Sequence, residues 1–414
     1  MEKITASIIT IGDELLIGQV VDTNSTWMAK ELNKIGVWVQ RRLAVGDDWN
    51  EIWKALNEES SNSDIILITG GLGPTGDDIT KPLLCQYFNG NMVMDVATLE
   101  HITYIFEVLL KRPMIERNRK QAEIPDTCTI LKNERGTAPG MLFEKNGKIF
   151  ISMPGVPHEM KGIMQDHVLK LLQQRFSLPY IGHRTLLTFG IGESFLAEKI
   201  KDFEGELPND IKLAYLPNYG MVRLRLTSIG EKIIVEKELD NQFRQLKELV
   251  KEYLVTDTDL PMHIVMSNLL KKHKKTLATA ESCTGGYIAQ QITSVAGASE
   301  YFTGSVVCYH NSIKRNLLHV SHETLAVDGA VSEATVTQMA KGVLEEMKTD
   351  YAIAVSGIMG PDGGSPEKPV GTVWIAVADS NKVESFRLHF RFDRQKNIEL
   401  TAINAMNFLR LFIL

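Results

Sequence analysis

The chain has 414 residues, of which 44% are hydrophobic and 23% are charged, a balance that is ordinary for a folded globular protein. At roughly 100–200 residues per domain, this length predicts two to four domains. The formal net charge of -6 argues against a dedicated nucleic-acid binder, because such proteins are usually basic. One dense basic run, KKHKK at residues 271–275, could contact phosphate, but a solvated helix end is the interpretation we favour.

The four cysteines, which are Cys85, Cys128, Cys283 and Cys308, are far apart and show no Cys-x-x-Cys spacing. This pattern argues against a disulfide framework or a thiolate zinc site and fits a reducing compartment. The first residues indicate a strand rather than a signal peptide, and no apolar run approaches the roughly 18–20 residues that a membrane helix needs. We therefore expect a cytoplasmic protein that has no membrane partner.

Apolar, β-branched runs alternate with helical patterns over residues 1–176. The expected elements are strands at residues 6–11, 64–69 and 148–153 and helices at residues 23–35 and 157–176. The first helix places Trp27, Met28, Leu32 and Ile35 on one face. This alternation predicts a doubly wound α/β sheet.

The character of the sequence changes near Leu178 and Pro179, which begins a small α+β domain at residues 177–256. The expected elements are strands at residues 185–189 and 221–227, helices at 193–203 and 233–253, and a turn at 216–220. The strand at 221–227 alternates apolar and charged residues, as a half-exposed strand should.

A polar segment that ends in Pro261 leads into a third domain, residues 257–414. It opens with a helix that carries Ile264, Met266, Leu269 and Leu270. Strands are expected at residues 276–280, 304–309, 351–356 and 371–376. Ligands bind at the carboxyl ends of strands in open α/β sheets, and three of these strand ends carry reactive or glycine-rich sequence.

The first strand end carries ESCTGG at residues 281–286, between a strand and a helix start. Glycines there let backbone N–H groups approach an anion, and a helix N-terminus favours negative charge. Ser282 and Thr284 could supply hydroxyl groups for catalysis or could simply cap the helix. The residues alone do not separate these two roles.

The second strand end leads from Tyr309 into a helix that Asn311 or Ser312 can cap, so that Lys314 falls in the first helical turn. The positive end of the helix dipole and partial burial would both lower the pKa of this lysine. A lysine with a lowered pKa can act as a general base. The alternative is a solvated lysine on the helix surface.

The third strand end carries SGIMGPDGG at residues 356–364, a long glycine-rich loop after an apolar strand. Successive backbone N–H groups in such a loop can cradle a phosphate. A plain surface loop is the alternative, and the position at a strand end argues against it.

Together these segments resemble the C-terminal domain of the competence/damage-inducible protein A (CinA) family, the nicotinamide mononucleotide deamidases. The resemblance covers about residues 261–414 and rests on five ordered motifs. They are AESCTGG, GSVVCYHNSIK, GAVSE at residues 329–333, AVSGIMGPDGG, and KPVGTVW at residues 368–374.

The resemblance implies an α/β/α domain that hydrolyses the amide of nicotinamide mononucleotide to give nicotinate mononucleotide and ammonia. It makes Ser282 the nucleophile, with Lys314 and Tyr309 as proton-transfer partners, and it needs no metal or other cofactor. A serine hydroxyl becomes a good nucleophile only when a neighbouring base takes its proton. Backbone N–H groups of residues 283–286 could form an oxyanion hole. The implied substrate-binding residues are Thr284, Gly285, Gly286, Ser356, Gly357, Gly360 and Arg394.

One departure from the family pattern lies near the last strand, where the family usually has Gly-Asp-Arg. This chain has Phe392, Asp393 and Arg394 instead. Arg394 is kept and is expected to contact a phosphate or a carboxylate. The absence of this glycine is expected to change the local loop geometry and therefore the affinity for substrate.

In the first domain, GGLGPTGDDIT at residues 70–80 follows a buried strand. Its glycines permit close backbone approach to a phosphate, and the adjacent Asp77 and Asp78 suit a hard divalent cation. The alternative is a turn followed by an aspartate-rich helix start. Further turn segments that accompany it are GDELL at 12–16, NRKQA at 118–122, GTAPG at 136–140 after Asn133, and PGVPHEM at 154–160.

This set resembles the N-terminal domain of the same family, a three-layer α/β/α domain that is similar to molybdopterin-binding proteins of the MoaB type. The resemblance covers about residues 4–176 and implies a pyrophosphatase that converts ADP-ribose to AMP and ribose 5-phosphate. It implies a divalent metal of unknown identity, with K⁺ also considered, and metal-assisted attack of water. Asp77 and Asp78 are the catalytic or metal-binding candidates; Gly71, Gly73, Thr75, Asn118, Arg119, Lys120 and Gly155 are the phosphate-binding ones. The rival interpretation is binding of molybdopterin or adenylyl-molybdopterin. These ligands also carry phosphate, so the phosphate-binding residues do not distinguish them from ADP-ribose.

The middle domain is similar to the KH-like module of full-length family members. A KH module clamps a nucleic-acid backbone with a Gly-x-x-Gly loop, whereas this chain has only Gly190, Ile191 and Gly192. We therefore favour a structural or dimer-forming role, and a competence-associated nucleic-acid function is the weaker alternative. The expected partners are small nucleotide substrates and a second copy of the chain, since symmetric dimers are the commonest assembly.

Overall fold

The structure is a computed structural model that describes residues 3–76 and 78–414. The chain divides into two compact units, which are described separately. The first comprises Met1–His183, Leu207–Lys212 and Leu226–Phe243, and the second comprises Arg184–Glu206, Leu213–Arg225 and Arg244–Leu414.

The N-terminal domain is built on a six-stranded sheet with the order β2-β1-β3-β8-β7-β6. Its strands are β1 (Thr5–Ile11), β2 (Trp38–Val45), β3 (Ile65–Thr69), β6 (Thr129–Leu131), β7 (Gly140–Lys145) and β8 (Lys148–Met153). Its helices are α1 (Asp13–Leu16), α2 (Thr23–Lys34), α3 (Trp49–Asn62), α4 (Thr80–Tyr87), α7 (Pro157–Ile163) and α8 (Leu169–Arg175), with a π-helical segment, η3 (Met164–Val168), between the last two. β1, β2, β3 and β8 are parallel, and β7 and β6 run antiparallel.

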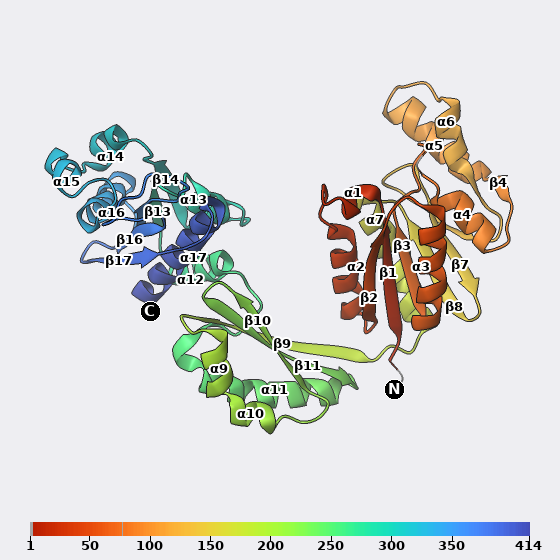
Figure 1. Ribbon diagram of the computed structural model, residues 1–414, viewed down its shortest axis with the longest axis horizontal. Helices are drawn as coiled ribbons and strands as arrows, with labels where there is room; N and C mark the ends of the chain where they lie inside the picture. Colours follow the sequence, from red (N-terminus) through yellow and green to blue (C-terminus); the bar gives the residue numbers. More distant parts are fainter. Residues whose placement is uncertain (1–2, 77) are drawn as a thin grey trace. The chain divides into compact units, whose positions relative to one another are not determined.

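Helices cover both faces of this sheet (Figure 1). One face packs Met28 and Leu32 of α2 and Ile163 of α7 against alternate strand residues. The other face packs Ile52 and Leu56 of α3, with Leu83 and Leu84 of α4, against the intervening strand residues. The strands are apolar on both faces because a parallel sheet is covered on both sides. The expected three-layer α/β/α fold is confirmed.

The segment between α4 and β6, residues 88–128, is called the excursion here. It lies beyond the same end of the sheet as α1, which follows β1 (Figure 1). It consists of β4 (Met92–Met94), α5 (Val96–Thr103), the π-helical η1 (Tyr104–Leu109), α6 (Glu116–Arg119), η2 (Lys120–Ala122) and β5 (Glu123–Pro125). β4 and β5 form their own antiparallel pair. The excursion therefore stands at the carboxyl ends of the parallel strands, where a ligand site is expected.

The middle domain has a four-stranded sheet with the order β10-β11-β9-β12. Its elements are β9 (Tyr180–Phe189), α9 (Glu193–Lys199), α10 (Lys201–Gly205), β10 (Lys212–Asn218), β11 (Met221–Gly230), α11 (Lys232–Leu249), η4 (Lys251–Tyr253) and β12 (Leu254–Thr256). β9 begins five residues before the strand expected from Thr185, because it continues back through the polar Arg184 and His183 to Ile181 and Tyr180. The α+β character of this domain is confirmed.

The C-terminal domain has a five-stranded sheet with the order β14-β13-β15-β16-β17. Its strands are β13 (Leu277–Glu281), β14 (Phe302–Val307), β15 (Tyr351–Gly357), β16 (Thr372–Ala378) and β17 (Val383–His389). Its helices are α12 (Met262–His273), α13 (Tyr287–Thr293), η5 (Ala298–Glu300), α14 (Asn311–Leu318), α15 (His322–Val327), α16 (Glu333–Met347) and α17 (Arg394–Ile413). The first three strands in chain order are parallel, and β16 and β17 are antiparallel to their neighbours.

The two faces of this sheet differ in side-chain size. Large residues of β13, β15 and β16 face α12, α13 and α17. The fully buried hydrophobic residues that face α16 from the three central strands are all alanines, at positions 278, 280, 352, 354, 376 and 378, and the half-buried Trp374 packs against their edge. Small side chains let a helix approach the sheet closely, so α16 is held tightly against this face.

The basic run at residues 271–275 lies at the end of α12, where Lys274 takes a left-handed conformation. Lys272 and Lys274 are exposed, while Lys271 pairs with Glu300 and Lys275 with Asp350. The solvated helix end expected from the sequence is therefore confirmed.

Candidate active site

The turn after β13 positions Ser282 at the carboxyl end of the C-terminal sheet. The buried carboxylate of Glu281 accepts hydrogen bonds from the N–H groups of Ile288 and Ala289 and from the Thr284 hydroxyl. Glu281 therefore satisfies the first turn of α13, whose own N-cap residue, Gly286, makes no side-chain cap. Neither Ser282 nor Thr284 caps this helix, so the capping alternative is wrong. The Thr284 hydroxyl donates to Glu281, whereas the Ser282 hydroxyl contacts Lys314.

Lys314 is the partner of Ser282. Its Nζ lies 2.9 Å from Ser282 Oγ, 2.8 Å from the carbonyl oxygen of Cys308 and 3.4 Å from that of Tyr309. The side chain is 1% exposed, which excludes the solvated alternative. Desolvation by burial lowers the pKa of Lys314 below its usual value.

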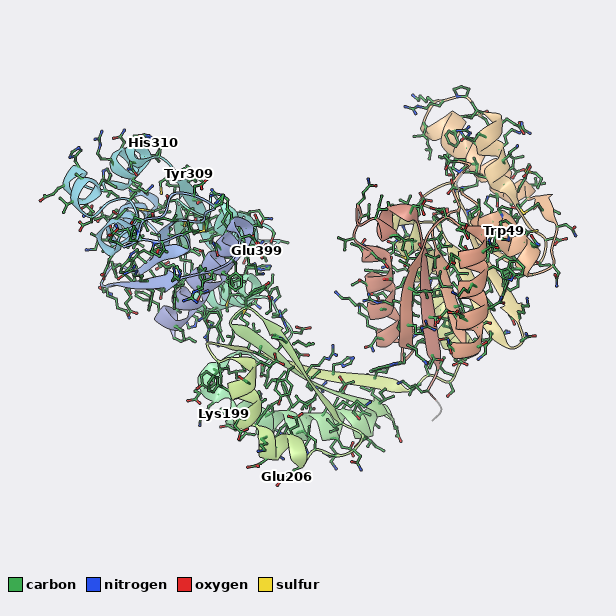
Figure 2. The ribbon with its side chains drawn as sticks, viewed as in Figure 1. Trp49, Lys199, Glu206, Tyr309, His310 and Glu399 are labelled. Atoms are coloured by element: carbon green, nitrogen blue, oxygen red, sulfur yellow. The ribbon has the colours of Figure 1, made fainter. Side chains whose placement is uncertain are left out.

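α14 brings Lys314 to this place. The helix begins at Asn311, and its N-cap is His310, whose ring nitrogen accepts from Ser312 N–H. The expectation that Asn311 or Ser312 caps the helix is wrong, because a histidine nitrogen takes the role of the usual side-chain oxygen. Figure 2 labels Tyr309 and His310 at the edge of the C-terminal domain, where β14 leads into α14.

The Cys283 thiol, which is next to Ser282 in the sequence, is a poor nucleophile. Cys283 is buried, and desolvation raises the pKa of its thiol to about 12. Cys308 is also buried, and its pKa is raised to about 11 by the same cause. Since the thiolate is the reactive form of cysteine, both thiols remain protonated and inert at neutral pH.

Arg394 and Tyr309 form the outer part of the site. Arg394 Nη2 donates to the Tyr309 hydroxyl at 3.1 Å, and Nη1 donates to the carbonyl oxygen of Gly360 at 2.7 Å. Tyr309 is 62% exposed, so its phenol stands at the rim beside the guanidinium. The structure thus joins Tyr309 to Arg394 through its hydroxyl and to Lys314 through its carbonyl oxygen.

A cavity of about 200 Å³ connects these groups, lined by Ser282, Cys283, Tyr309, Asn311, Lys314, Ala330, Val331, Ser356, Gly357, Met359 and Arg394. Ser356 Oγ donates to the carbonyl oxygen of Ala330 at 2.7 Å, which fixes the opposite wall. Ser332 continues this wall as the N-cap of α16. The GAVSE motif is therefore a wall segment and a helix cap.

The sequence-based candidates divide between this cavity and its supports. Ser282, Lys314, Tyr309, Ser356, Gly357 and Arg394 line it. Thr284, Gly285, Gly286 and Gly360 are not among the lining residues; the first three shape the turn, and Gly360 holds Arg394. Asn311, which sequence reasoning treated only as a cap, also lines the cavity. The sequence feature that could have indicated this role is its position between the strand end at Tyr309 and Lys314.

Phe392, the departure from the family pattern, packs edge-to-face against Tyr219 with ring centroids 5.1 Å apart. Lys396 Nζ lies 3.8 Å above the centre of the same tyrosine ring. Both contacts lie within the second compact unit. The larger residue that replaces glycine here is thus accommodated by an aromatic contact just before Arg394.

A second, larger cavity of about 450 Å³ lies at the carboxyl ends of the N-terminal strands. Its walls come from the segments around Gly12, Gly71, Gly155 and Thr137, and its complete lining is Ile11, Gly12, Glu14, Asp47, Gly70, Gly71, Leu72, Gly73, Pro74, Asp78, Gln121, Thr137, Ala138, Pro154, Gly155, Val156 and Glu159. Three of the predicted glycines, at positions 71, 73 and 155, therefore line one cavity. Gly71 has a positive φ of 64°, and a Cβ there would lie 2.1 Å from Thr80 Oγ1. Glycine is the residue that this turn permits.

Asp78 lines the same cavity but already holds the glycine-rich loop. Its carboxylate accepts from Gly73 N–H and Thr75 N–H, both at 2.8 Å, and from the Thr75 hydroxyl. α4 begins only at Thr80, so Asp78 belongs to the loop and not to a helix start. Asp77, the other metal or catalytic candidate, lies outside the described residues.

The three candidates on the excursion do not line this cavity. Asn118 and Arg119 belong to α6, Lys120 begins η2, and Arg119 faces Glu116 at 3.9 Å. Gln121 lines the cavity in their place. Lys81, which sequence reasoning missed, is buried beneath this region and donates to the carbonyl oxygens of Gln121 and Glu123. Desolvation lowers the pKa of Lys81 to about 8.

The carboxylates that line this cavity decide whether a divalent cation fits it. Hard cations take several oxygen ligands at once. Among the residues that the structure describes, no group of three or more histidine, cysteine, aspartate or glutamate side chains could hold a metal ion. Asp78 is engaged by the loop, so the described residues alone do not form the expected site.

Comparison with known proteins places the chain in a family. A CinA-like protein from Cytophaga hutchinsonii is 47% identical over 98% of this chain and 97% of its own length. The chain belongs to the CinA family. A CinA-like protein from Flavobacterium psychrophilum is 43% identical over 98% of this chain and 97% of its own. A crystal structure of competence damage-inducible protein A from Klebsiella pneumoniae subsp. pneumoniae MGH 78578 is 37% identical and covers 36% of this chain and 95% of that one, with a TM-score of 0.35.

Three family descriptions match successive parts of this CinA-family chain. "Probable molybdopterin binding domain" matches residues 7–174, "Damage-inducible protein CinA KH domain" matches 183–256, and "CinA C-terminal domain" matches 260–413. The resemblances to the CinA family, to MoaB-like proteins and to a KH-like module are thereby confirmed. Within the described part of the chain, none of the helices has the length and apolar character required to cross a membrane.

Proposed function

We propose that the C-terminal domain hydrolyses the amide of nicotinamide mononucleotide, with Ser282 as nucleophile and Lys314 as general base. The contact that carries this proposal is the 2.9 Å distance between Lys314 Nζ and Ser282 Oγ. Protonated Lys314 donates to Ser282 Oγ and to the two carbonyl oxygens, and the loss of one proton leaves its amine with two N–H donors and one lone pair. The carbonyl oxygens of Cys308 and Tyr309 accept the two hydrogens, which leaves the lone pair for the hydroxyl of Ser282.

In the first step, Ser282 Oγ attacks the amide carbon while its proton moves to Lys314 Nζ. The tetrahedral oxyanion then collapses, the C–N bond breaks, and Lys314 returns the proton to the departing nitrogen, which leaves as ammonia. The product of this step is an ester on Ser282. One group serves as base and then as acid, as in other serine hydrolases with a single proton carrier.

In the second step, water attacks the ester carbon and gives its proton to Lys314. The new tetrahedral intermediate expels Ser282 Oγ, which takes that proton back, and nicotinate mononucleotide is released. Atoms balance as one amide and one water converted to one carboxylic acid and one ammonia.

The oxyanion needs donors at the turn that carries the nucleophile. Within the part of the chain that the structure describes, Ser282 N–H donates to Val355 and Gly285 N–H donates to Ser282 O. Of the neighbouring residues 283–286, Cys283 is the one that lines the cavity, so its N–H group is the proposed donor to the developing negative charge. Arg394 at the rim suits the 5′-phosphate, since a guanidinium binds phosphate with two parallel hydrogen bonds.

The test is ammonia release from nicotinamide mononucleotide by the full chain, by Ser282→Ala and by Lys314→Met. Both variants should lose at least a hundredfold in kcat, because each removes a group without which the hydroxyl is not activated. Ser294→Ala, which removes an exposed serine elsewhere, is the matched control. No release by the intact, folded chain would reject the proposal.

A second candidate function belongs to the N-terminal cavity. We propose that it binds a nucleotide diphosphate and hydrolyses ADP-ribose to AMP and ribose 5-phosphate. The observation that favours it is a cavity of about 450 Å³ whose lining includes the three predicted glycines and Gln121. Backbone N–H groups at such glycines bind phosphate oxygens. The divalent cation that the resemblance implies is part of this proposal, and a binding role towards molybdopterin is the rival to be tested against it.

A further inference from the structure

The turn of the β10–β11 hairpin carries a large aromatic residue where the backbone favours a small one. Tyr219 and Gly220 are the two residues between the strands, and both have a positive φ, of 42° and 79°. Two positive φ values are the mark of a type I′ turn, which prefers asparagine followed by glycine. Tyrosine at the first position is strained, so its side chain is expected to have a role outside the turn.

The hairpin that carries this turn is fixed to the C-terminal domain. Met221, at the start of β11, belongs to the same buried cluster as Met262 and Met266 of α12. Arg223 Nε, two residues further along β11, donates to Asp259 at 2.9 Å. These residues all lie in the second compact unit. The Tyr219 ring is therefore presented from a strand that is packed against the C-terminal domain.

The Tyr219 ring contacts residues on both sides of Arg394 in the sequence. The Phe392 ring meets it edge-to-face, with centroids 5.1 Å apart, and Lys396 Nζ lies 3.8 Å from the centre of its face. Phe392 precedes α17 and Lys396 lies in its first turn, so the ring spans the start of the helix that carries Arg394. A displacement of this helix start would break both contacts.

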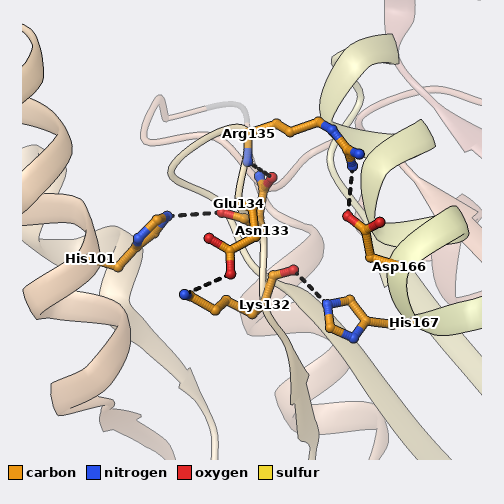
Figure 3. A network of polar contacts seen from close by, with 7 residues as sticks. All are labelled: His101, Lys132, Asn133, Glu134, Arg135, Asp166 and His167. Carbon is orange, nitrogen blue, oxygen red and sulfur yellow. Dashed lines mark hydrogen bonds and ion pairs between the residues drawn. The ribbon is translucent and has the colours of Figure 1, made fainter.

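The backbone before Arg394 has a separate support, of a kind that the N-terminal domain also uses. In Figure 3, the loop after β6 is held by Asn133, whose Oδ1 accepts from Arg135 N–H at 3.0 Å. In the C-terminal domain, the buried Asn397 accepts from Phe392 N–H at 3.3 Å and donates to the carbonyl oxygens of Phe392 and Met359. The backbone of Phe392 is therefore held without Tyr219, and the ring contacts restrain the side chains around Arg394.

Arg394 benefits from this restraint because its guanidinium has to keep one orientation. Its two hydrogen bonds, to the Tyr309 hydroxyl and to the carbonyl oxygen of Gly360, direct it along the rim of the cavity. A group that is already ordered loses less conformational entropy when it binds a phosphate than a mobile group does. Substrate affinity should therefore depend on how firmly the start of α17 is held.

We infer that Tyr219 of the middle domain is a positioning residue for Arg394 and thereby sets the affinity of the C-terminal site for the phosphate of its nucleotide substrate. The inference rests on the proposed deamidase function, in which Arg394 binds the 5′-phosphate. Tyr219 acts on binding and not on the chemical step, because Ser282 and Lys314 are carried by other elements. The middle domain then has a role in the C-terminal reaction.

The test removes the ring and keeps the turn. Tyr219→Asn creates the Asn-Gly pair that a type I′ turn prefers, so the hairpin should fold at least as well as before. Tyr219→Phe keeps both ring contacts and is the conservative variant. Phe195→Asn, which makes a similar exchange at a 75% exposed ring on α9 of the same domain, is the matched control.

Two measurements on the full chain separate binding from chemistry. Ammonia release would be followed with nicotinamide mononucleotide and with nicotinamide riboside, which lacks the phosphate. Calorimetry in a Ser282→Ala background would measure binding of the same two ligands without turnover. Tyr219→Asn should raise KM and Kd for the nucleotide about three- to tenfold, with kcat and the values for the riboside unchanged. Tyr219→Phe and Phe195→Asn should match the chain that keeps both rings.

Equal weakening of both ligands, a fall in kcat alone, or no effect of Tyr219→Asn on the nucleotide would overturn the inference. Nucleotide binding that weakens in Tyr219→Asn, without ammonia release by the unaltered chain, rejects the deamidase proposal alone. Ammonia release with an unchanged KM in Tyr219→Asn rejects the positioning role alone. Failure of the unaltered chain to bind the nucleotide rejects both.

Discussion

Lys314 is buried without a carboxylate in hydrogen-bonding contact. Its three polar neighbours are a hydroxyl and two carbonyl oxygens, none of which carries a full negative charge. Desolvation therefore lowers the pKa of Lys314 with little to oppose it. A lysine that loses its proton more readily is a better base at neutral pH.

The pH dependence of ammonia release should report this lysine. Since the neutral amine is the base, kcat/KM should rise with pH and level off above a midpoint that lies below the usual lysine value of 10.5. Lys314→Arg should lose at least a hundredfold in activity, because a guanidinium stays protonated throughout. Initial rates over the neutral and alkaline range would measure this, with the exposed Lys341→Arg as control. A flat profile, or full activity in Lys314→Arg, would contradict the role of Lys314.

The proximity of Ser282 and Lys314 could be predicted from the family resemblance, but the directions of the neighbouring side chains could not. Ser282 and Lys314 were expected to meet, and they do. Thr284 was expected to contact substrate, yet its hydroxyl donates to Glu281. Both hydroxyls lie in one six-residue motif, and only the path of the turn, with Gly285 and Gly286 at positive φ, decides which faces the cavity. That path depends on the buried carboxylate of Glu281, whose partners lie three, seven and eight residues further along the chain.

Buried elements were predictable because their pattern is complete in one segment. β13 and β15 lie within one residue of the expected strands, since each is an apolar run between turns. The edge strand β2 was missed, because Gln40, Arg41 and Arg42 are exposed and interrupt its apolar pattern. The long α17 was also missed, since it is buried on one side only and follows the irregular segment at Phe392.

The packing of α16 against α14 sets the position of the base. Gly342 of α16 is buried, and a Cβ there would lie 2.1 Å from the carbonyl oxygen and 2.8 Å from the Cα of Leu318, the last residue of α14. Lys314 lies on the same short helix, one turn before Leu318. Backbone atoms cannot rotate away from a new methyl group, so α14 would have to move.

Gly342→Ala should therefore destabilise the chain despite the better helix propensity of alanine. Overpacking against backbone atoms costs about 1–3 kcal/mol and the propensity gain is about 1 kcal/mol, so the net loss in the free energy of unfolding should be up to about 2 kcal/mol. Ammonia release should fall as well, because Lys314 shifts with α14. Denaturant titration would measure the first effect. The neighbouring Lys341→Ala, on the exposed side of α16, should change stability by no more than about 0.5 kcal/mol. Equal stability of the two variants would show that α14 yields freely.

The two sites use different means to reach a reactive state. In the C-terminal site the proposed nucleophile and base are both side chains, and the proposed mechanism moves the proton between Ser282 and Lys314, whose polar atoms are 2.9 Å apart. In the N-terminal site the described residues supply glycines to the cavity lining, while the carboxylates there are engaged or dispersed. The proposed hydrolysis of a diphosphate at that site depends on added positive charge, which a divalent cation provides.

Chelation should therefore separate the two activities within one preparation of the full chain. Excess chelator should abolish AMP release from ADP-ribose and leave ammonia release from nicotinamide mononucleotide unchanged, and Ser282→Ala should give the reverse pattern. Readdition of Mg²⁺, Mn²⁺ or Co²⁺ in turn, with and without K⁺, should restore AMP release and identify the metal. If chelation reduced both activities in parallel, the C-terminal reaction would also need a cation, and a mechanism carried by Ser282 and Lys314 alone would be wrong. If Ser282→Ala reduced both, the two sites would share a step, which neither the glycine-lined cavity nor the serine–lysine pair would predict.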